Sequence, residues 1–368
     1  MASAVIRPSA PVPVRPPERG PKVVIIGDRF MSPSVFEAAI RARCPAPLEI
    51  ETAELPWPDQ PMRHGYAEPG MEGLKEYQGD ADEIVRWIGD AEVLVTQLAP
   101  LSATMLERAP ELKLIVVARG GPVNVDVAAA RRRKTMVVNT PGRNASAVAE
   151  FTIGLILAET RLITRGHDAL RGGLWRGDLY RADLVGPELS ELSVGVIGYG
   201  HIGTKVVRLL KAFGCRILVA DPYVQLSAAD ASDGVRQVKF DALLRDSDVV
   251  TLHARVTAET RGFIGGKEFA AMRKGAYFIN TARGPMVDYE ALTEALKSGR
   301  LRGAALETFA VEPAPADLEL LRLNNVTLTP HIAGASLKTI EHAANAAAEE
   351  VRRYLAGEGP LNPCDVAP

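Results

Sequence analysis

Cysteine is scarce in this sequence, and long apolar runs are missing. Only three cysteines occur in 368 residues, Cys44, Cys215 and Cys364, and their spacing fits neither a disulfide framework nor a metal site. The longest apolar stretch, Phe151 to Ala158, is far shorter than the roughly 18 residues that a membrane-spanning helix needs. We therefore expect a cytoplasmic protein with reduced thiols and no membrane segment.

The chain also lacks an excess of charge of either sign. Its 43 Lys and Arg residues are balanced by 45 Asp and Glu residues. Such a balance gives no general attraction to nucleic acid or to an anionic membrane, so the expected partner is a small molecule. A chain of this length can form two domains, each with its own core.

Two segments have no pattern of regular structure. Residues 1–21 are rich in proline and lack the apolar core of a signal peptide, which predicts a disordered tail. Residues 55–70 carry many turn-forming residues, which predicts a loop.

Short apolar runs alternate with helical patterns along the rest of the chain. A first series of runs covers residues 22–27, 92–97, 114–119 and 136–141. A second series begins at Val194 and ends near Pro330, and longer helical patterns at Asn144–Arg161 and Ser336–Gly357 flank it. This alternation predicts an α/β fold with parallel sheets that are covered on both faces.

The second series opens with a glycine-rich turn, in the stretch VGVIGYGHIG. Gly198, Gly200 and Gly203 follow an apolar run and precede the helical pattern of residues 202–213, as in a dinucleotide-binding βαβ unit. The pyrophosphate would lie at the helix N-terminus. Asp221 ends the next run, where its carboxylate can accept hydrogen bonds from the ribose hydroxyls and repel a 2′-phosphate. The pattern favours NAD over NADP.

Six motifs give the chain a family resemblance. They are, in order, NTPGRNASAVAE, VGVIGYGHIG, TLHARVTAETRGFIG, FINTARGPMVD, ETFAVEP and LTPHIAGAS. In content, order and spacing the chain resembles the D-isomer-specific 2-hydroxyacid dehydrogenases, which include D-3-phosphoglycerate, D-lactate and hydroxypyruvate/glyoxylate enzymes. The resemblance covers nearly everything after the proline-rich tail.

The resemblance implies a specific architecture. Two flavodoxin- or Rossmann-like domains with parallel sheets are expected, with an NAD-binding domain of residues 140–331 inserted into a substrate-binding domain of residues 22–139 and 332–368. The active site would lie in the cleft between them. A homodimer is also implied, with Asn144–Arg161 as an interface helix.

Three residues match the catalytic positions of the family. His331 would take the proton from the substrate hydroxyl while hydride leaves the same carbon for the nicotinamide ring. Glu312 would orient His331 and stabilise its imidazolium form. Arg283 would pair with the substrate carboxylate and polarise the adjacent carbonyl in the reductive direction.

Further positions match the cofactor-binding residues of the family. His201 and Ile202 belong to the glycine turn, and Glu307 stands where the family commonly has Asp. The same likeness assigns three more residues to the dinucleotide groove: His253, Thr281 and Ala282. No histidine has metal-ligand spacing to another, so we expect no metal site.

The substrate side departs from the family pattern in the stretch RGGPVNVD. Gly120 and Gly121 retain backbone N–H groups that can hold a carboxylate, and Asn144 matches a polar substrate-side residue. Arg119 and Arg143 add positive charge if they face the cleft. With Arg283 they would exceed the need of one carboxylate, which favours a sugar acid or a phosphorylated acid.

The predicted activity is that of an NAD-dependent D-2-hydroxyacid dehydrogenase. Two alternatives stay open from the sequence. An NAD-regulated corepressor-like binding protein shares the fold and the dinucleotide site. Phosphite oxidation is the other alternative, within the enzymes of the family.

Overall fold

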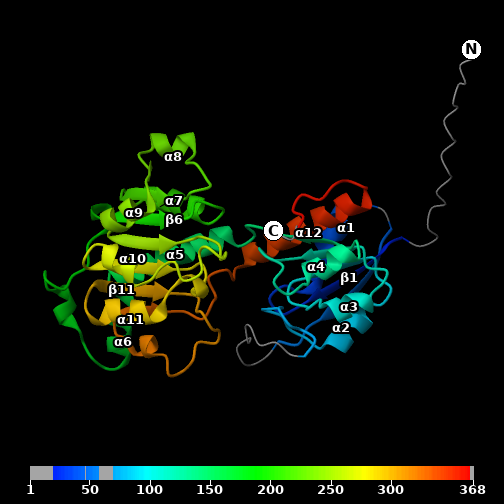
Figure 1. Ribbon diagram of the computed structural model, residues 1–368, viewed down its shortest axis with the longest axis horizontal. Coiled ribbons are helices and arrows are strands. Elements are labelled where there is room, and N and C mark those ends of the chain that lie inside the picture. The colour runs from blue at the N-terminus through cyan, green and yellow to red at the C-terminus, as the bar shows by residue number, and fades with distance from the viewer. Residues whose placement is uncertain (1–19, 46, 58–68, 365–368) are drawn as a thin grey trace, which may run out of the picture.

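The chain forms two α/β lobes that lie side by side (Figure 1). The computed structural model describes residues 20–45, 47–57 and 69–364. The predicted tail and most of the predicted loop at residues 55–70 lie outside the described residues. No helix in the described part of the chain is both long and apolar enough to cross a membrane.

The first lobe contains a five-stranded parallel sheet with the order β2-β1-β3-β4-β5. Its strands are β1 (Lys22–Gly27), β2 (Glu49–Glu54), β3 (Val93–Thr96), β4 (Leu114–Val117) and β5 (Met136–Asn139). Its helices are α1 (Pro33–Arg43), α2 (Ala81–Ile88), α3 (Ala103–Glu107) and α4 (Val127–Arg132), together with the last helix of the chain, α12 (Leu337–Leu355).

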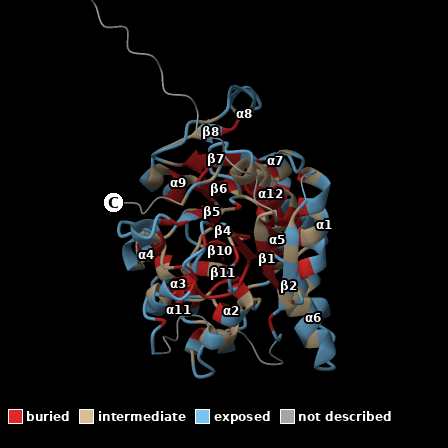
Figure 2. Ribbon diagram, turned by 90° about the vertical axis from the view of Figure 1, so that its right-hand side faces the viewer, coloured by how far each residue is buried: buried red, intermediate tan, exposed pale blue. Residues whose placement is uncertain are grey.

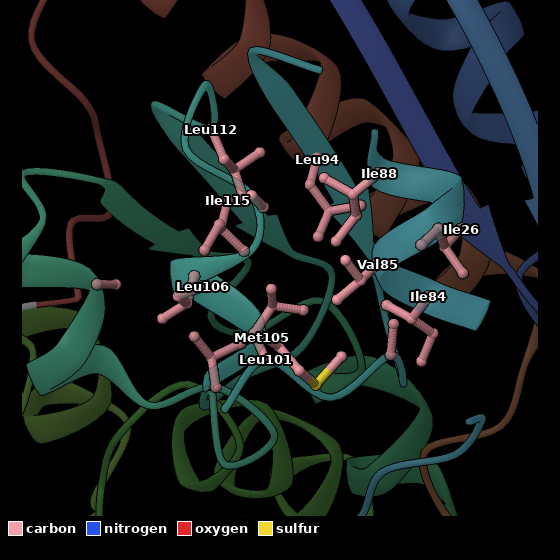
Figure 3. Close-up of a cluster of buried hydrophobic side chains, with 14 of the residues drawn as sticks. Ile26, Ile84, Val85, Ile88, Leu94, Leu101, Met105, Leu106, Leu112 and Ile115 are labelled. Atoms are coloured by element: carbon pink, nitrogen blue, oxygen red, sulfur yellow. The ribbon is translucent and has the colours of Figure 1, made fainter. Parts of the chain in front are cut away.

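Both faces of this sheet are covered, which explains its continuous apolar strands. Leu94 of β3 faces a core with α2, α3 and α4, to which Ile84 and Met105 contribute (Figure 3). Val93 and Val95, which alternate with Leu94, face the opposite core with α1 and α12. The return of α12 to this sheet, where it packs along α1, makes the first lobe discontinuous in sequence.

The second lobe contains a seven-stranded parallel sheet with the order β12-β11-β10-β9-β6-β7-β8. Its strands are β6 (Ser193–Ile197), β7 (Arg216–Ala220), β8 (Arg236–Gln237), β9 (Val249–Leu252), β10 (Ala276–Asn280), β11 (Leu301–Leu306) and β12 (Val326–Leu328). Its α-helices are α5 (Ala145–Thr160), α6 (Ile163–Arg171), α7 (Gly203–Lys211), α8 (Ala228–Ser232), α9 (Phe240–Asp246), α10 (Gly266–Ala271) and α11 (Tyr289–Lys297). Short 3₁₀ helices are η1 (Gly177–Tyr180), η2 (Leu189–Glu191), η3 (Gly284–Met286) and η4 (Glu319–Arg322).

The predicted fold class is confirmed by these two parallel sheets. The three long helical patterns correspond to α5, α7 and α12. Two edge strands were missed, β2 and β8. The sequence of β2, EIETAE, is mostly polar because much of this edge strand is exposed, and β8 has only two residues, too few for any periodicity.

The helices α5 and α6 differ sharply in burial, as the red and pale-blue segments of Figure 2 show. Most residues of α5 are buried against α7 and the second sheet, whereas α6 has no buried residue. One carboxylate ties these helices to the sheet edge. Glu159 of α5 accepts hydrogen bonds from Arg165 Nη2 (2.9 Å) in α6 and from Thr327 Oγ1 (2.5 Å) in β12.

Glu159 makes the stability of the protein dependent on pH. Burial raises the pKa of its carboxyl to about 7, from an ordinary value of 4.5. A group whose pKa is raised in the folded state stabilises that state below its unfolded pKa, and this contribution is lost as the pH rises through the folded pKa. As the pH rises from 4.5 to 7, the unfolding free energy of the wild type should therefore fall by about 2–3 kcal/mol relative to that of Glu159→Gln, whose amide does not titrate.

This difference can be measured by urea denaturation of the two proteins across that pH range. Glu150→Gln, a change at an exposed position of the same helix, is the matched control and should give no such trend. A constant difference between Glu159→Gln and the wild type at all pH values would contradict the expectation.

Candidate active site

The glycine turn connects β6 to α7 and has the geometry of a dinucleotide-binding turn. Gly198 has φ +93°, a left-handed conformation that glycine adopts without strain, and a Cβ there would lie 2.8 Å from the backbone carbon of His253. A Cβ at Gly200 would meet no atom within 4 Å, so this side of the turn is open to a ligand. Gly203 packs directly on the carbonyl oxygen of Gly198, and only a glycine permits this contact.

Asp221 lies beside this turn, immediately after β7. Its Oδ2 accepts a hydrogen bond from the backbone N–H of Tyr199 (2.7 Å), and its Oδ1 accepts one from that of Tyr223 (2.8 Å). Oδ1 also accepts the backbone N–H of Val224 (3.0 Å), so three bonds fix the carboxylate, and Oδ2 keeps a second lone pair that can accept from a ligand hydroxyl. The open turn and the fixed acid fit the adenosine and pyrophosphate parts of a dinucleotide.

The two histidines near this turn differ in environment. His253 is buried after β9, its Nε2 lies 2.9 Å from Thr251 Oγ1, and burial lowers its pKa to about 3, so its ring is neutral at physiological pH. His201 is exposed, and its Cγ lies 3.1 Å from where a Cβ of Gly142 would stand. Ile202, the residue after His201, packs against the core beside α7. Because the ring of His253 is buried and neutral, we expect no proton transfer from it.

The candidate acid–base pair is formed by His331 and Glu312. Nδ1 of His331 lies 2.7 Å from Oε2 of Glu312, and Oε1 of Glu312 accepts the backbone N–H of Phe309 (2.8 Å). His331 has φ +54°, a left-handed conformation that costs free energy at a non-glycine residue and often occurs in functional sites. Sequence reasoning named this pair, and the structure brings the two residues into contact.

Glu307 holds the turn that carries His331. Its carboxylate is buried, and Oε1 accepts the backbone N–H of Ala333 (2.8 Å), while its carbonyl oxygen accepts that of His331 (2.9 Å). Burial raises the pKa of Glu307, and the interactions with His331 and with the N–H of Ala333 oppose this rise. The carboxylate of Glu307 therefore binds the backbone beyond the histidine.

The turn after β10 places Arg283. Asn280 shapes this turn, since its Oδ1 accepts the N–H of Ala282 (3.0 Å) and its Nδ2 donates to the carbonyl of Arg283 (3.2 Å). The hydroxyl of Thr281 pairs with that of Thr152 in α5 (2.8 Å). Arg283 itself is exposed, and its Nη1 donates to the carbonyl of Ala282 (2.8 Å).

The substrate side is built from turns that follow β4 and β5. A Cβ at Gly120 or Gly121 would meet no atom within 4 Å, which leaves their backbone open to a bound carboxylate. Asn144 lies against the turn that follows His331, because a Cβ at Gly334 would stand 2.7 Å from its Nδ2. The segment that follows β5 therefore reaches the histidine turn.

Two arginines predicted for this side are close enough to Arg283 to repel it. Burial, with the charge of Arg283 as a smaller cause, lowers the pKa of Arg119 to about 9 and that of Arg143 to about 10. The Nε atom of Arg143 is buried and has no hydrogen-bond partner among the described residues. Three arginines therefore share one region.

Two acidic residues of this region were not identified from the sequence. Glu76 forms an ion pair with Arg119, and Asp28, which is fully buried, interacts electrostatically with Arg143. The sequence did contain a signal for Asp28, because this residue directly follows the apolar run of β1, and ligand-binding residues of parallel sheets gather at the carboxyl ends of the strands. Glu76 had none, because it belongs to a turn without periodicity.

Together these residues can bind an anion, hold a dinucleotide and exchange a proton. Comparisons with known proteins identify the family of the chain. The sequence profile described as D-isomer specific 2-hydroxyacid dehydrogenase, NAD binding domain, matches residues 153–333. A glyoxylate reductase of Thermofilum pendens is 37% identical over 305 residues, which are 80% of this chain and 90% of that protein.

Two further proteins resemble this chain in sequence or in structure. A D-3-phosphoglycerate dehydrogenase of Methanocaldococcus jannaschii is 41% identical over 280 residues, which cover 75% of this chain but only 52% of the longer relative. The crystal structure of the TT0316 protein from Thermus thermophilus superposes with a TM-score of 0.74 at 31% identity, over 93% of this chain and 100% of that one. The protein is therefore an NAD(P)-dependent 2-hydroxyacid dehydrogenase, and it belongs to the D-isomer specific 2-hydroxyacid dehydrogenase family.

Proposed function

We propose that this protein transfers hydride between NAD and a D-2-hydroxy acid or its 2-oxo acid, with His331, Glu312 and Arg283 as the catalytic residues. The observation that carries the proposal is the hydrogen bond between His331 Nδ1 and Glu312 Oε2. An imidazole oriented by a carboxylate at one nitrogen is suited to proton transfer at the other.

The roles of the three side chains follow from their chemistry. In the oxidative direction, Nε2 of His331 accepts the proton of the substrate hydroxyl, and Glu312 stabilises the imidazolium that results. Arg283 binds the carboxylate and fixes the orientation of the reacting carbon. Bound NAD supplies the acceptor for the hydride that leaves this carbon.

We assign the cofactor preference to Asp221. Its carboxylate is fixed beside the glycine turn by the N–H groups of Tyr199 and Tyr223. A negative charge at this place attracts ribose hydroxyls and repels the 2′-phosphate of NADP. The other proposed cofactor contacts are the residues that surround this turn and the nicotinamide side: Gly198, Gly200, His201, Ile202, Gly203, His253, Thr281, Ala282 and Glu307.

The proposed domain limits follow the two sheets. Strands β1 to β5 and helix α12 support a substrate-binding domain of residues 22–139 and 332–368. Strands β6 to β12 support a cofactor domain of residues 140–331.

We also propose a cytoplasmic location. The three cysteines are present as thiols, which is typical of a reducing compartment.

The proposed substrate is more polar than lactate. Gly120, Gly121 and Asn144 would bind it together with Arg283. The additional arginines, Arg119 and Arg143, support either a sugar acid or a phosphorylated acid, because both offer acceptors beyond the carboxylate.

We also propose a homodimer, with an interface that includes the segment after α5. The apolar side chains of α5 are mostly covered within one chain, whereas the following residues carry an exposed apolar group: Ile163, Leu170, Leu174, Trp175, Tyr180 and Val185. Large apolar side chains gathered on one segment of a folded chain favour an interface, and a second copy of the chain would cover them.

Replacement of His331 tests the catalytic proposal. We expect His331→Ala to lower kcat by roughly a hundredfold or more, because in the reductive direction the carbonyl oxygen of the substrate loses its proton donor, while NADH binding is retained. NADH oxidation with glyoxylate and hydroxypyruvate, and NADH titration by fluorescence, measure these two quantities. His342→Ala, at an exposed position of α12, is the matched control. Unchanged turnover in His331→Ala would exclude His331 from the mechanism.

Removal of the charge of Asp221 tests the cofactor proposal. Asp221→Asn keeps an acceptor for a backbone N–H group, so it should preserve much of the turn and change mainly the charge. We expect the wild type to prefer NADH, and we expect the ratio of kcat/KM for NADH to that for NADPH to fall by about tenfold or more in the variant. A wild type that prefers NADPH would refute the proposal.

A charge placed in the exposed apolar segment tests the proposed interface. We expect the wild type to have the mass of a dimer by light scattering, and Trp175→Asp to shift it toward the monomer because a buried carboxylate would be costly. Leu337→Asp, at another highly exposed leucine, should keep the wild-type mass. A dimer that persists in Trp175→Asp would place the interface elsewhere.

A further inference from the structure

The charges around the three arginines separate the two proposed substrate classes. Arg119, Arg143 and Arg283 together carry three positive charges, more than one substrate carboxylate requires. Arg119 and Arg143 also have an acidic neighbour each, and these neighbours decide how much positive charge is left for a substrate.

The acidic neighbour of Arg119 is Glu76. The two side chains form an ion pair, and Nη1 of Arg119 also donates to the carbonyl oxygen of Glu76 (2.8 Å). Both side chains are largely shielded from water, with 13% and 16% of their surface exposed. Since screening by water is weak at such burial, Glu76 offsets most of the charge that Arg119 would present to a ligand.

The turn that carries Glu76 is anchored at the same edge of the sheet. The N–H of Lys75 donates to the carbonyl of Val123 (2.8 Å), and that of Gln78 donates to the carbonyl of Leu98 (3.0 Å). Leu74 of this turn is buried in the core below. The carboxylate of Glu76 therefore has a fixed position next to the turn of Gly120 and Gly121.

The acidic neighbour of Arg143 is Asp28, at the end of β1. Its Oδ1 accepts the N–H groups of Phe30 (2.8 Å) and Met31 (2.7 Å), which fixes the carboxylate in place. Burial raises the pKa of Asp28, and the charge of Arg143 lowers it. The two groups therefore interact electrostatically, without a direct ion pair, and each favours the charged form of the other.

We infer that Glu76 and Asp28 make this site selective for a substrate with one negative charge, a 2-oxo or 2-hydroxy monocarboxylate with an uncharged distal end, and against a phosphorylated acid. Glu76 offsets the charge of Arg119 through an ion pair, and Asp28 offsets part of that of Arg143 through its electrostatic interaction, so that Arg283 is left as the main positive charge for the substrate carboxylate. A distal phosphate would meet two fixed carboxylates of its own sign. This inference rests on the proposed function and names its substrate class, within which a neutral sugar acid fits.

The test compares hydroxypyruvate with 3-phosphohydroxypyruvate, which differ by one phosphate. We expect kcat/KM of the wild type with NADH to be at least tenfold higher for hydroxypyruvate. Glu76→Gln keeps the shape of the side chain and frees the charge of Arg119, so the ratio of phosphorylated to unphosphorylated kcat/KM should rise about tenfold or more. Glu83→Gln, which alters an exposed acid of α2 near Arg86, is the matched control and should leave the ratio unchanged.

A second variant separates the charge effect from a loosened turn. In the double variant Glu76→Gln/Arg119→Gln, the gain for the phosphorylated acid should disappear, because the arginine that would bind the phosphate is absent. A gain that persists would show that the turn, and not the charge of Arg119, sets the preference, and would overturn the inference. An unchanged ratio in Glu76→Gln alone would overturn it as well.

Binding without turnover gives an independent measurement. With NAD present, D-glycerate should raise the Tm of the wild type more than D-3-phosphoglycerate does, and Glu76→Gln should make this difference smaller. If no 2-oxo acid is reduced, the proposed function fails. If 2-oxo acids are reduced but the wild type prefers the phosphorylated one, only the selectivity inferred from Glu76 and Asp28 fails.

Discussion

The direction of the strands is the constraint on which the site depends. Both sheets are parallel, so within each sheet the carboxyl ends of all strands lie on the same side. Ligand-binding residues of such sheets gather in the turns on that side. Asp28, Arg119, Asp221 and Arg283 all follow such strand ends, although they are far apart in the sequence. Residues of both lobes are therefore available for the proposed binding of a dinucleotide and a substrate next to each other.

The histidine turn shows how buried acids keep a strained group in place. His331 has a left-handed backbone conformation, which costs free energy unless neighbouring contacts favour it. Glu312 binds the ring, while Glu307 binds the backbone on both sides of the histidine through its carboxylate and its carbonyl. These contacts fix the orientation of the ring, as its proposed role in proton transfer requires.

Charge compensation differs between the two lobes. In the second lobe, Glu312 is paired with His331, whose charge changes during a reaction of the proposed kind. In the first lobe, Glu76 and Asp28 accompany arginines whose charge is permanent. In the function proposed above, acidic residues of the first kind would support proton transfer, and those of the second kind would limit the charge of the ligand.

Much of the fold and of the site could be predicted from the sequence, because its signals are local. The apolar runs that became β1, β3 to β7 and β9 to β12 are covered on both faces, and the glycine turn with Asp221 obeys a fixed spacing within one βαβ unit. The motif order identified the family and named His331 and Glu312. The strands β2 and β8 were missed, since an exposed edge strand and a strand of two residues carry no apolar pattern. Only the tertiary structure could show that Glu76 pairs with Arg119 and that Asp28 interacts electrostatically with Arg143, because these charges are 43 and 115 positions apart and leave no periodic trace in the sequence.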